Sequence, residues 1–563
     1  MIYHCEDHTC NYWDEGEKLP ERCPQCGRKL LRANEADMTG DDWTALGNTL
    51  WDAEASDKKR MVDCFRKAAY LGSAWGVCNL GICMEQGNGV EADPVQAFWL
   101  YQQAVEMGSL NAVCCLGVCY QYGIGTAPDA EKAAELYCKA AEYGSPRGQM
   151  LLAHAFHDGI GVEADAAEAV HWVRAAAYQR YGEGMYRLGV CYEYGDGVEQ
   201  NWEHAVHWFR EAAESGVSAA MTDLGWCYEK GCGVEQSWEQ AFSWYRRGAE
   251  CGDPVSMCNL GLCYKMGHGV EQNWQEAVKW YEQGAQCGNL QSMNNLAYCY
   301  EYGEGVEQNE ERALYWYRRG AEAGSDYCMY CLGWNYSNGE GVEQNMTEAI
   351  RWYTAAAEGG NADAMHDLGW LYDHGEGVEQ DMKKAICWYE RAAEQNCPAA
   401  MNSLGECYAM GRGVPRDLET AMEWYRRAAE LGEAMADYNM GWHLEQAGKL
   451  SEAYAHYRKA ADGNDDSAWW ALGRFYENGV VVAQDGKEAR RCYETGEKLG
   501  SVKCKMRLAR CKLLGIGGRR AKKAGLDLCR QALELAKESS EKEDYGYEAE
   551  MNLLRRTIAE NES

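Results

Sequence analysis

The chain has 563 residues, of which 46% are hydrophobic, 25% are charged and only 8 are proline, a composition typical of a globular, helix-rich protein. Its net charge of −33 excludes nucleic acid and anionic membrane surfaces as favourable partners, because both repel an acidic protein. The sequence shows neither a secretory signal pattern nor a long apolar run, so we expect a cytoplasmic protein that does not enter membranes.

Residues 1–35 are expected to form a small metal knuckle. Cys5 and Cys10 are separated by four residues, Cys23 and Cys26 by two, and twelve residues lie between the pairs. Four thiolates at such spacing are typical of a tetrahedral zinc site, which with four protein ligands is closed and structural. A reducing cytosol does not maintain disulfides, so we expect the cysteines to be thiols or metal ligands.

This N-terminal segment resembles the rubredoxin-like end of rubrerythrins, in which iron takes the place of zinc. The first cysteine pair departs from that pattern by two extra residues, which favours zinc over iron. His4 and His8 stand beside this pair and are alternative ligands for one of the cysteines.

A unit of 36 residues repeats through most of the chain. A Leu-Gly pair, or a close variant of it, recurs at this spacing, and we call its first residue the anchor. The anchors with unbroken spacing are Leu80, Leu116, Leu152, Leu188, Leu224, Leu260, Leu296, Leu332, Leu368, Leu404 and Met440. Leu46, Leu472 and Leu508 extend the array to about fourteen units within residues 36–540, and residues 541–563 are expected to form a C-terminal capping helix.

Each unit contains two stretches with helical spacing of apolar residues. In the unit from Ser256 to Gly288 they are separated by a Gly-His-Gly turn, and Asn273 is placed to cap the second helix. Such hairpins expose apolar residues on more than one face and must stack on their neighbours. The pattern therefore predicts an all-α solenoid of helical hairpins.

The unit LGVCYEYGDGVEQNWEHAVHWFREAAESG, from Leu188 to Gly216, resembles the pattern of the Sel-one-like repeat (SLR) family, a relative of tetratricopeptide repeats. The resemblance covers about residues 40 to 530. It implies a right-handed αα-superhelical solenoid that acts as a protein-protein interaction adaptor or scaffold, with other proteins as its partners.

Two periodic features are expected to belong to the packing. Cysteine stands three residues after the anchor, where it can serve as a small buried hydrophobe or, alternatively, form a redox-sensitive ladder; these are Cys83, Cys119, Cys191, Cys227, Cys263, Cys299 and Cys407. Tryptophan stands twenty residues after the anchor, where inter-helix packing is favoured over a binding role; these are Trp208, Trp244, Trp280, Trp316, Trp352, Trp388 and Trp424.

The candidate binding residues lie two and five residues after the anchor, on one face of the first helix. By analogy with tetratricopeptide arrays this face is expected to line the concave groove. The aromatic positions are Trp226, Tyr298, Trp334, Trp370 and Trp442, and the acidic positions are Glu193, Glu229, Glu301, Asp373 and Glu445. Aromatic anchors with carboxylates suit apolar or basic peptide segments. The alternative is that the aromatics shield neighbouring helices and the acids only solvate the surface.

No catalytic motif is complete in the sequence. There is no GxSxG elbow, phosphate loop or HExxH helix, and the GxG pairs lack the strand that a dinucleotide site needs. We therefore expect no enzyme. The alternative function is a β-lactamase-like role, which has been linked to some SLR relatives, or electron transfer through the N-terminal knuckle.

Overall fold

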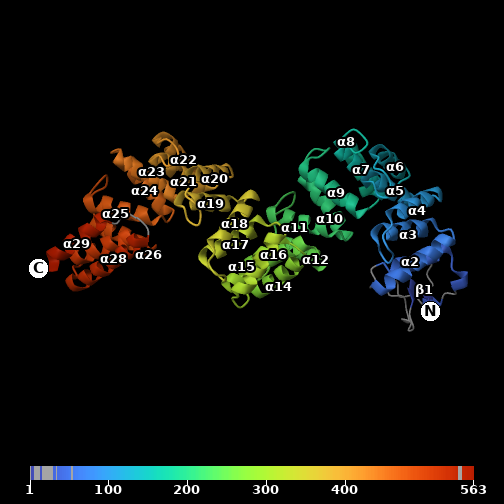
Figure 1. Cartoon of the computed structure of the whole chain (residues 1–563), viewed down its shortest axis with the longest axis horizontal. Helices are drawn as coiled ribbons and strands as arrows, with labels where there is room; N and C mark the ends of the chain where they lie inside the picture. Colours follow the sequence, from blue (N-terminus) through green and yellow to red (C-terminus); the bar gives the residue numbers. More distant parts are fainter. Residues whose placement is uncertain are drawn as a thin grey trace. The chain divides into compact units, whose positions relative to one another are not determined.

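The computed structural model describes residues 2–5, 13–15, 30–32, 35–51, 55–542 and 548–562. The chain divides into two compact units, Met1–Ser292 and Met293–Ser563, each of which is described by itself. Figure 1 shows that helices account for most of both units.

The N-terminal segment contributes a small antiparallel sheet. Strands β1 (Ile2–Cys5), β2 (Trp13–Glu15) and β3 (Leu30–Arg32) pair in the order β2-β1-β3. Cys5, the last residue of β1, is in register with Leu30 of β3. The other three proposed zinc ligands, Cys10, Cys23 and Cys26, lie outside the described residues, so the zinc knuckle remains a prediction.

A short 3-10 helix (Glu35–Asp37) leads into helices α1 to α28, which form fourteen consecutive pairs in the described part of the chain. The first helices of the pairs are α1 (Gly40–Thr49), α3 (Ala74–Gln86), α5 (Leu110–Tyr122), α7 (Pro146–Asp158), α9 (Gly182–Tyr194), α11 (Ser218–Lys230), α13 (Pro254–Met266), α15 (Leu290–Tyr302), α17 (Asp326–Asn338), α19 (Ala362–His374), α21 (Pro398–Met410), α23 (Ala434–Gln446), α25 (Asp466–Asn478) and α27 (Val502–Leu514).

The second helices of the pairs are α2 (Ala55–Tyr70), α4 (Pro94–Glu106), α6 (Ala130–Glu142), α8 (Ala166–Tyr178), α10 (Trp202–Glu214), α12 (Trp238–Glu250), α14 (Trp274–Gln286), α16 (Glu310–Glu322), α18 (Met346–Glu358), α20 (Met382–Glu394), α22 (Leu418–Glu430), α24 (Leu450–Asp462), α26 (Gly486–Lys498) and α28 (Lys522–Lys542). A last helix, α29 (Glu548–Glu562), packs on α27 and α28. Within each unit, neighbouring pairs pack on one another, as stacked hairpins are expected to do.

The turn inside a hairpin follows from its residues. In the pair α13 and α14, Gly267 ends the first helix in the left-handed conformation, and the Asn273 side chain accepts a 3.1 Å hydrogen bond from the Glu276 amide. Gly269 also has a positive φ of 70°, and a Cβ on it would lie 2.2 Å from the carbonyl oxygen of Trp238. Only glycine therefore allows this turn to rest on the preceding hairpin.

Contact between the two helices of a hairpin depends on the glycine after the anchor. A Cβ on Gly405 would lie 2.5 Å from the ring of Tyr425, and the same relationship recurs from Gly47 and Phe65 to Gly473 and Tyr493. The aromatic residue that fills the centre of a hairpin is thus the one that follows the repeating tryptophan position. The tyrosines at this position are almost completely buried.

The periodic tryptophans lie at the edge of this core. Trp244 and Trp316 are buried, as predicted, whereas Trp208, Trp280, Trp352, Trp388 and Trp424 are half-buried. An arginine three residues later covers several of them, and its guanidinium lies 4.3 Å from the ring centre of Trp388 and 4.4 Å from that of Trp424. Trp244 and Trp316 therefore belong to the buried core, whereas the other five tryptophans are only partly packed.

The periodic cysteines are all buried, which confirms their predicted role as small core residues. Their sulfur atoms are not part of disulfides in the described structure. Burial raises the pKa of Cys83 to about 11 and that of Cys119 to about 12, so these thiols stay protonated at neutral pH. This favours packing over redox sensing.

Candidate binding surface and acidic pocket

The aromatic candidates differ between the two units. In the first unit, Trp226 is half-buried and its ring lies 5.7 Å from that of Trp202. In the second unit, all four aromatics at the same repeat position are exposed, namely Tyr298, Trp334, Trp370 and Trp442. Trp334 has the largest exposed fraction of the four, 46%. We call these four the first-helix aromatics.

Two of the first-helix aromatics contact a ring one helical turn later. The ring centres of Trp370 and His374 are 4.2 Å apart and the rings are stacked, whereas those of Tyr298 and Tyr302 are 4.6 Å apart and tilted. The two rings of each pair stand on the same face of the first helix because they are four residues apart. Each pair therefore offers a broad, ordered aromatic surface.

The acidic candidates are not free carboxylates. Glu229 accepts a 2.9 Å hydrogen bond from the buried Tyr245 hydroxyl, and Glu301 and Glu445 accept equivalent bonds from Tyr317 and Tyr457 at 2.7 and 2.8 Å. A buried tyrosine hydroxyl needs such a partner, because leaving it unpaired costs free energy. These glutamates thus have a structural role that the sequence analysis did not recognise.

Among the acidic candidates, Asp373 differs most from its predicted role as a groove residue. It is only 3% exposed and accepts a 2.9 Å ion-paired hydrogen bond from Arg412, so it is not available to a partner. Burial of a charge requires such compensation. Glu193 is half-buried, and burial followed by the nearby Asp223 carboxylate raises its pKa.

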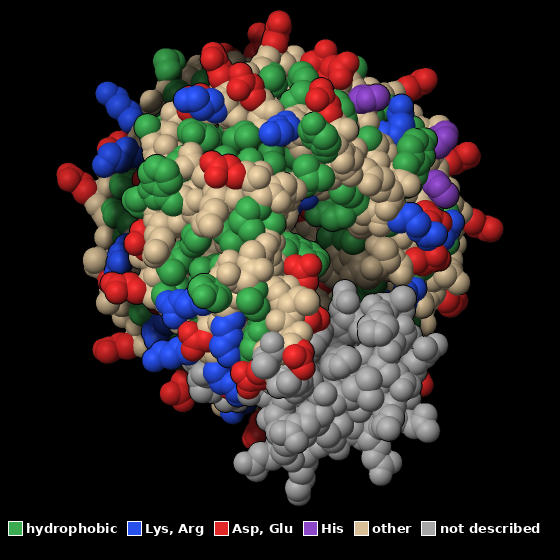
Figure 2. Space-filling model, turned by 90° about the vertical axis from the view of Figure 1, so that its right-hand side faces the viewer, with side chains coloured by type: hydrophobic (Ala, Val, Ile, Leu, Met, Phe, Trp, Pro, Cys, Tyr) green, Lys and Arg blue, Asp and Glu red, His purple; other side chains and the backbone are tan. Residues whose placement is uncertain are grey.

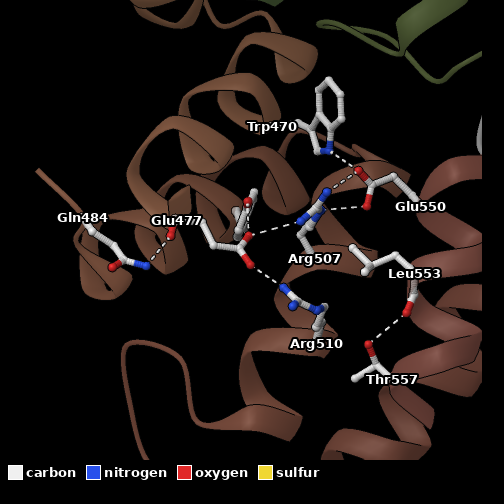
Figure 3. A network of polar contacts seen from close by, with 9 residues as sticks. Trp470, Glu477, Gln484, Arg507, Arg510, Glu550, Leu553 and Thr557 are labelled. Carbon is white, nitrogen blue, oxygen red and sulfur yellow. Dashed lines mark hydrogen bonds and ion pairs between the residues drawn. The ribbon is translucent and has the colours of Figure 1, made fainter. Parts of the chain in front are cut away.

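Arginines of the following hairpin neutralise other acidic positions in the second unit. Arg474 lies 3.0 Å from Glu445, and Glu477, the equivalent of Glu445 one repeat later, binds both Arg507 and Arg510. Figure 3 shows the contacts of Glu477 with these two arginines, and Arg507 also donates a 2.7 Å hydrogen bond to Glu550. Because Glu550 belongs to α29, these contacts tie the last helix to the repeats.

Among the described residues of the second unit, Glu301 is the acidic position for which no arginine partner is seen. Glu301 lines a cavity of about 420 Å³ together with Glu310, Glu340, Trp334 and Asn335, and we call this cavity the acidic pocket. Burial raises the pKa of Glu301, and Glu340 and Glu310 add to this while the bond from Tyr317 opposes it. The three carboxylates are therefore close enough to repel one another.

Exposed aromatics also occur outside the candidate surface. Figure 2 looks at the N-terminal end of the first unit and shows hydrophobic side chains among Lys and Arg, with acidic side chains around the edge. Tyr70, Trp75 and Trp99 are exposed in this unit. Exposure alone therefore does not identify a binding residue, and the regular repeat position of the first-helix aromatics is the stronger signal.

Neither a metal site nor a membrane span emerges from these elements. Within the ranges that the structure describes, no three His, Cys, Asp or Glu side chains are placed to hold a metal ion. Across the same ranges, no helix combines the length and the apolar character that crossing a bilayer requires.

The fold and its repeated turns define an α-helical repeat protein of the tetratricopeptide-like superfamily. Twelve matches to the Sel1 repeat model between residues 76 and 501 cover more than half of the chain. The chain belongs to the Sel1 repeat family, which confirms the SLR resemblance. Proteins of this family generally act in protein-protein interaction and are typically not enzymes. No curated protein sequence matches the chain significantly.

Two solved structures illustrate the likeness. A protective antigen of uropathogenic Escherichia coli with an SLR fold is 30% identical, with a TM-score of 0.55 over 76% of this chain and 90% of the antigen. A Sel1 repeat protein from Oxalobacter formigenes is 28% identical over 56% of this chain and 93% of its own, with a TM-score of 0.44.

The matched repeats contain both the first-helix aromatics and the acidic pocket. The repeat at 326–361 holds Trp334 and Glu340, and the one at 290–325 holds Glu301 and Glu310. Glu301 and Trp334 were predicted from the sequence, whereas Asn335, Glu310 and Glu340 were not. Asn335 had a visible signal, because it stands where eight other repeats have cysteine.

Proposed function

We propose that this protein is an adaptor that binds segments of other proteins along the first-helix aromatics of its second unit. The observation that carries the proposal is the recurrence of exposed aromatic rings at one repeat position, at Tyr298, Trp334, Trp370 and Trp442. Large aromatics are the usual energetic centres of protein interfaces, and recurrence at one repeat position distinguishes these four from singly scattered exposed rings.

Some of the acidic candidates are already paired within the protein, and this limits the kind of partner segment that can bind. Asp373 is buried against Arg412, and Glu445 is paired with both Tyr457 and Arg474. Around Trp370 and Trp442 the contacts that support binding are therefore mainly apolar. A partner segment with apolar side chains at intervals fits these two positions, and a basic side chain fits only beside Trp334.

The test is a full-length variant in which Trp334, Trp370 and Trp442 are all changed to alanine. Each side chain is more than one third exposed, so we expect the helical content and melting temperature to change little. The proteins captured from a lysate by the wild type should be lost. We expect the loss to appear as a drop of more than about tenfold in quantitative mass spectrometry, because such rings contribute 2 kcal/mol or more each.

The matched control changes three exposed aromatics outside the candidate surface, Trp99, Tyr143 and Tyr315, to alanine. It should retain the captured proteins. Equal loss in both variants, or no loss in either, would contradict the proposed surface. Unfolding of the first variant alone would show that its tryptophans belong to the core.

A further inference from the structure

The acidic pocket combines features that point to a positively charged ligand. Glu301 comes from the end of α15, Glu310 is the first residue of α16, and Glu340 lies in the turn after α17. Trp334 and Tyr302 add aromatic faces to the same cavity. No Lys or Arg is among the described residues that line it. Carboxylates beside aromatic rings form a favourable environment for a cation.

A second, independent observation is the state of Asn335. This side chain lines the pocket, is only 4% exposed, and its Oδ1 atom has no hydrogen-bond partner among the described residues. Buried amide oxygens are almost always paired, because an unpaired one has given up its hydrogen bonds to water without a replacement. At the same repeat position, Cys299 and Cys407 need no such partner. A hydrogen-bond donor from a ligand in the pocket would give the Asn335 Oδ1 atom the partner that it lacks.

Equivalent positions in other repeats of the protein show which chemical group fits the acidic pocket. Asp373 stands five residues after its anchor, as Glu301 does, and Arg412 of the next repeat binds it at 2.9 Å. Arg412 stands eight residues after its own anchor, between two glycines. In the acidic pocket that position belongs to Glu340, also between two glycines, so a carboxylate replaces the guanidinium.

At the position two residues after the anchor, the acidic pocket likewise lacks an arginine that later repeats have. Arg474 and Arg510 occupy it in later repeats, and each binds the acidic residue of the preceding repeat, Glu445 and Glu477 respectively. Trp334 takes this position in the acidic pocket. Two of the three positions that supply an internal guanidinium elsewhere in the second unit are thus occupied by residues that attract one. The third, where Arg507 stands one residue before its anchor, is Cys331 in the repeat of Trp334.

We propose that the acidic pocket binds the guanidinium of an arginine side chain in a partner protein. This inference rests on the proposed adaptor function and names the one charged contact of its binding surface. Arginine is favoured over lysine because its planar fork can donate to two carboxylates and an amide oxygen while its face stacks on Trp334. Every internal cation that occupies the equivalent place is also an arginine.

The test uses the full chain labelled with 5-fluorotryptophan and followed by ¹⁹F NMR, with the Trp334 signal assigned from W334F. The probe is N-acetyl-arginine methylamide. The corresponding citrulline compound is the neutral control, and the lysine compound is the control for charge without the planar fork. We expect the arginine compound to shift the Trp334 signal saturably, the lysine compound to bind more weakly, and the citrulline compound to have no effect.

The decisive variant is Glu340→Arg, which reproduces the turn that holds Arg412. An internal guanidinium should then occupy the pocket, weaken binding of the arginine compound by at least about tenfold, and raise the melting temperature. The charge-matched control is Glu343→Arg, in the same turn but exposed and outside the pocket lining. It should change the affinity by less than about twofold.

Two results would overturn the inference. One is equal binding of the arginine and citrulline compounds; the other is equal loss of binding in the Glu340→Arg and Glu343→Arg variants, which would indicate only long-range attraction by an acidic protein. The experiments distinguish an error in the proposed arginine contact from an error in the proposed adaptor surface. If the three-tryptophan variant loses partners that Glu340→Arg retains, the surface is correct and the arginine contact is wrong.

Discussion

The ring of Tyr281 occupies the space that a side chain on Gly261 would need, since a Cβ there would lie 2.5 Å from its Cε1 atom. We therefore expect Gly261→Val to destabilise the protein by roughly 1–3 kcal/mol, because the core must move to accept the added atoms. Gly261→Ala should cost less, since Ala297 and Tyr317 already occupy the equivalent positions of the next repeat. Chemical denaturation of the full chain, followed by circular dichroism, measures this loss.

The chain contains its own control for the Gly261 experiment. Ala153 replaces the repeat glycine after Leu152, and the residue twenty positions later is Val173 in place of an aromatic residue. Tyr281→Val should therefore partly relieve the strain of Gly261→Ala, which appears as a favourable coupling in a double-mutant cycle. Simple additivity of the two substitutions would contradict the steric explanation.

Removal of Arg412 should expose the cost of a buried carboxylate. Asp373 is 3% exposed and pairs with Arg412, so we expect Arg412→Gln to reduce the free energy of unfolding by roughly 2–4 kcal/mol. The control is Arg426→Gln, which breaks exposed pairs with Glu423 and Glu430 and should change the free energy of unfolding little, because water screens these charges. Similar losses in the two variants would show that burial of Asp373 is unimportant.

Asp465 should make stability depend on pH. Burial, followed by the charges of Asp466 and Glu433, raises its pKa to about 6, against about 3.9 in an unfolded chain. The folded state therefore disfavours the ionised form, and stability falls as pH rises from about 4 to about 6. We expect Asp465→Asn to raise the melting temperature at pH 7.5 and to have little effect at pH 4.5.

The amide retains the role of Asp465 as a helix cap, since its oxygen can still accept the hydrogen bond from the Ala468 amide. Asp417 is the matched control. It also caps a helix, but hydrogen bonds from Thr420 lower its pKa. The ionised form is favoured there, so Asp417→Asn should not stabilise the protein at pH 7.5. A rise in melting temperature for both variants would contradict the assignment to Asp465.

The N-terminal cysteines give a prediction that is independent of the repeats. We propose that Cys5, Cys10, Cys23 and Cys26 hold one structural zinc ion. Elemental analysis of the full chain should find about one zinc per molecule, and the variant with both Cys23→Ser and Cys26→Ser should lose it. Cys251 and Cys287 are exposed, so the same double substitution at these positions is the control. Iron in place of zinc, or no metal, would contradict the assignment.

The helices and their turns could be predicted because their signals are local. Asn273 lies three residues before the amide that it caps, and Cys263 follows its anchor by less than one turn of helix. The roles of the acidic residues could not be predicted in this way. Asp373 and Arg412 are 39 residues apart, and whether a carboxylate faces its own tyrosine, a neighbouring arginine or solvent is decided by packing between hairpins.

The acidic pocket is a second feature that could not be predicted from local sequence signals. Trp334 and Glu301 were predicted as parts of an open groove, but their pocket is completed by Glu340 and Asn335. Comparison of equivalent positions between repeats would have revealed the departure at Asn335, whereas the repeats on either side have Glu304 and Glu376 at the position of Glu340. The sequence pattern describes what the repeats share, whereas a binding site depends on where a single repeat differs.

The acidic pocket is built by two adjacent repeats, the earlier contributing Glu301 and Glu310 and the later contributing Trp334 and Glu340. The aromatic residue and the glycine that meet at the centre of most hairpins, by contrast, lie within one repeat. Exchange of whole repeats can therefore preserve every hairpin core while it creates or removes a pocket at each new junction. In such an array, the order of the units is itself a source of new binding specificity.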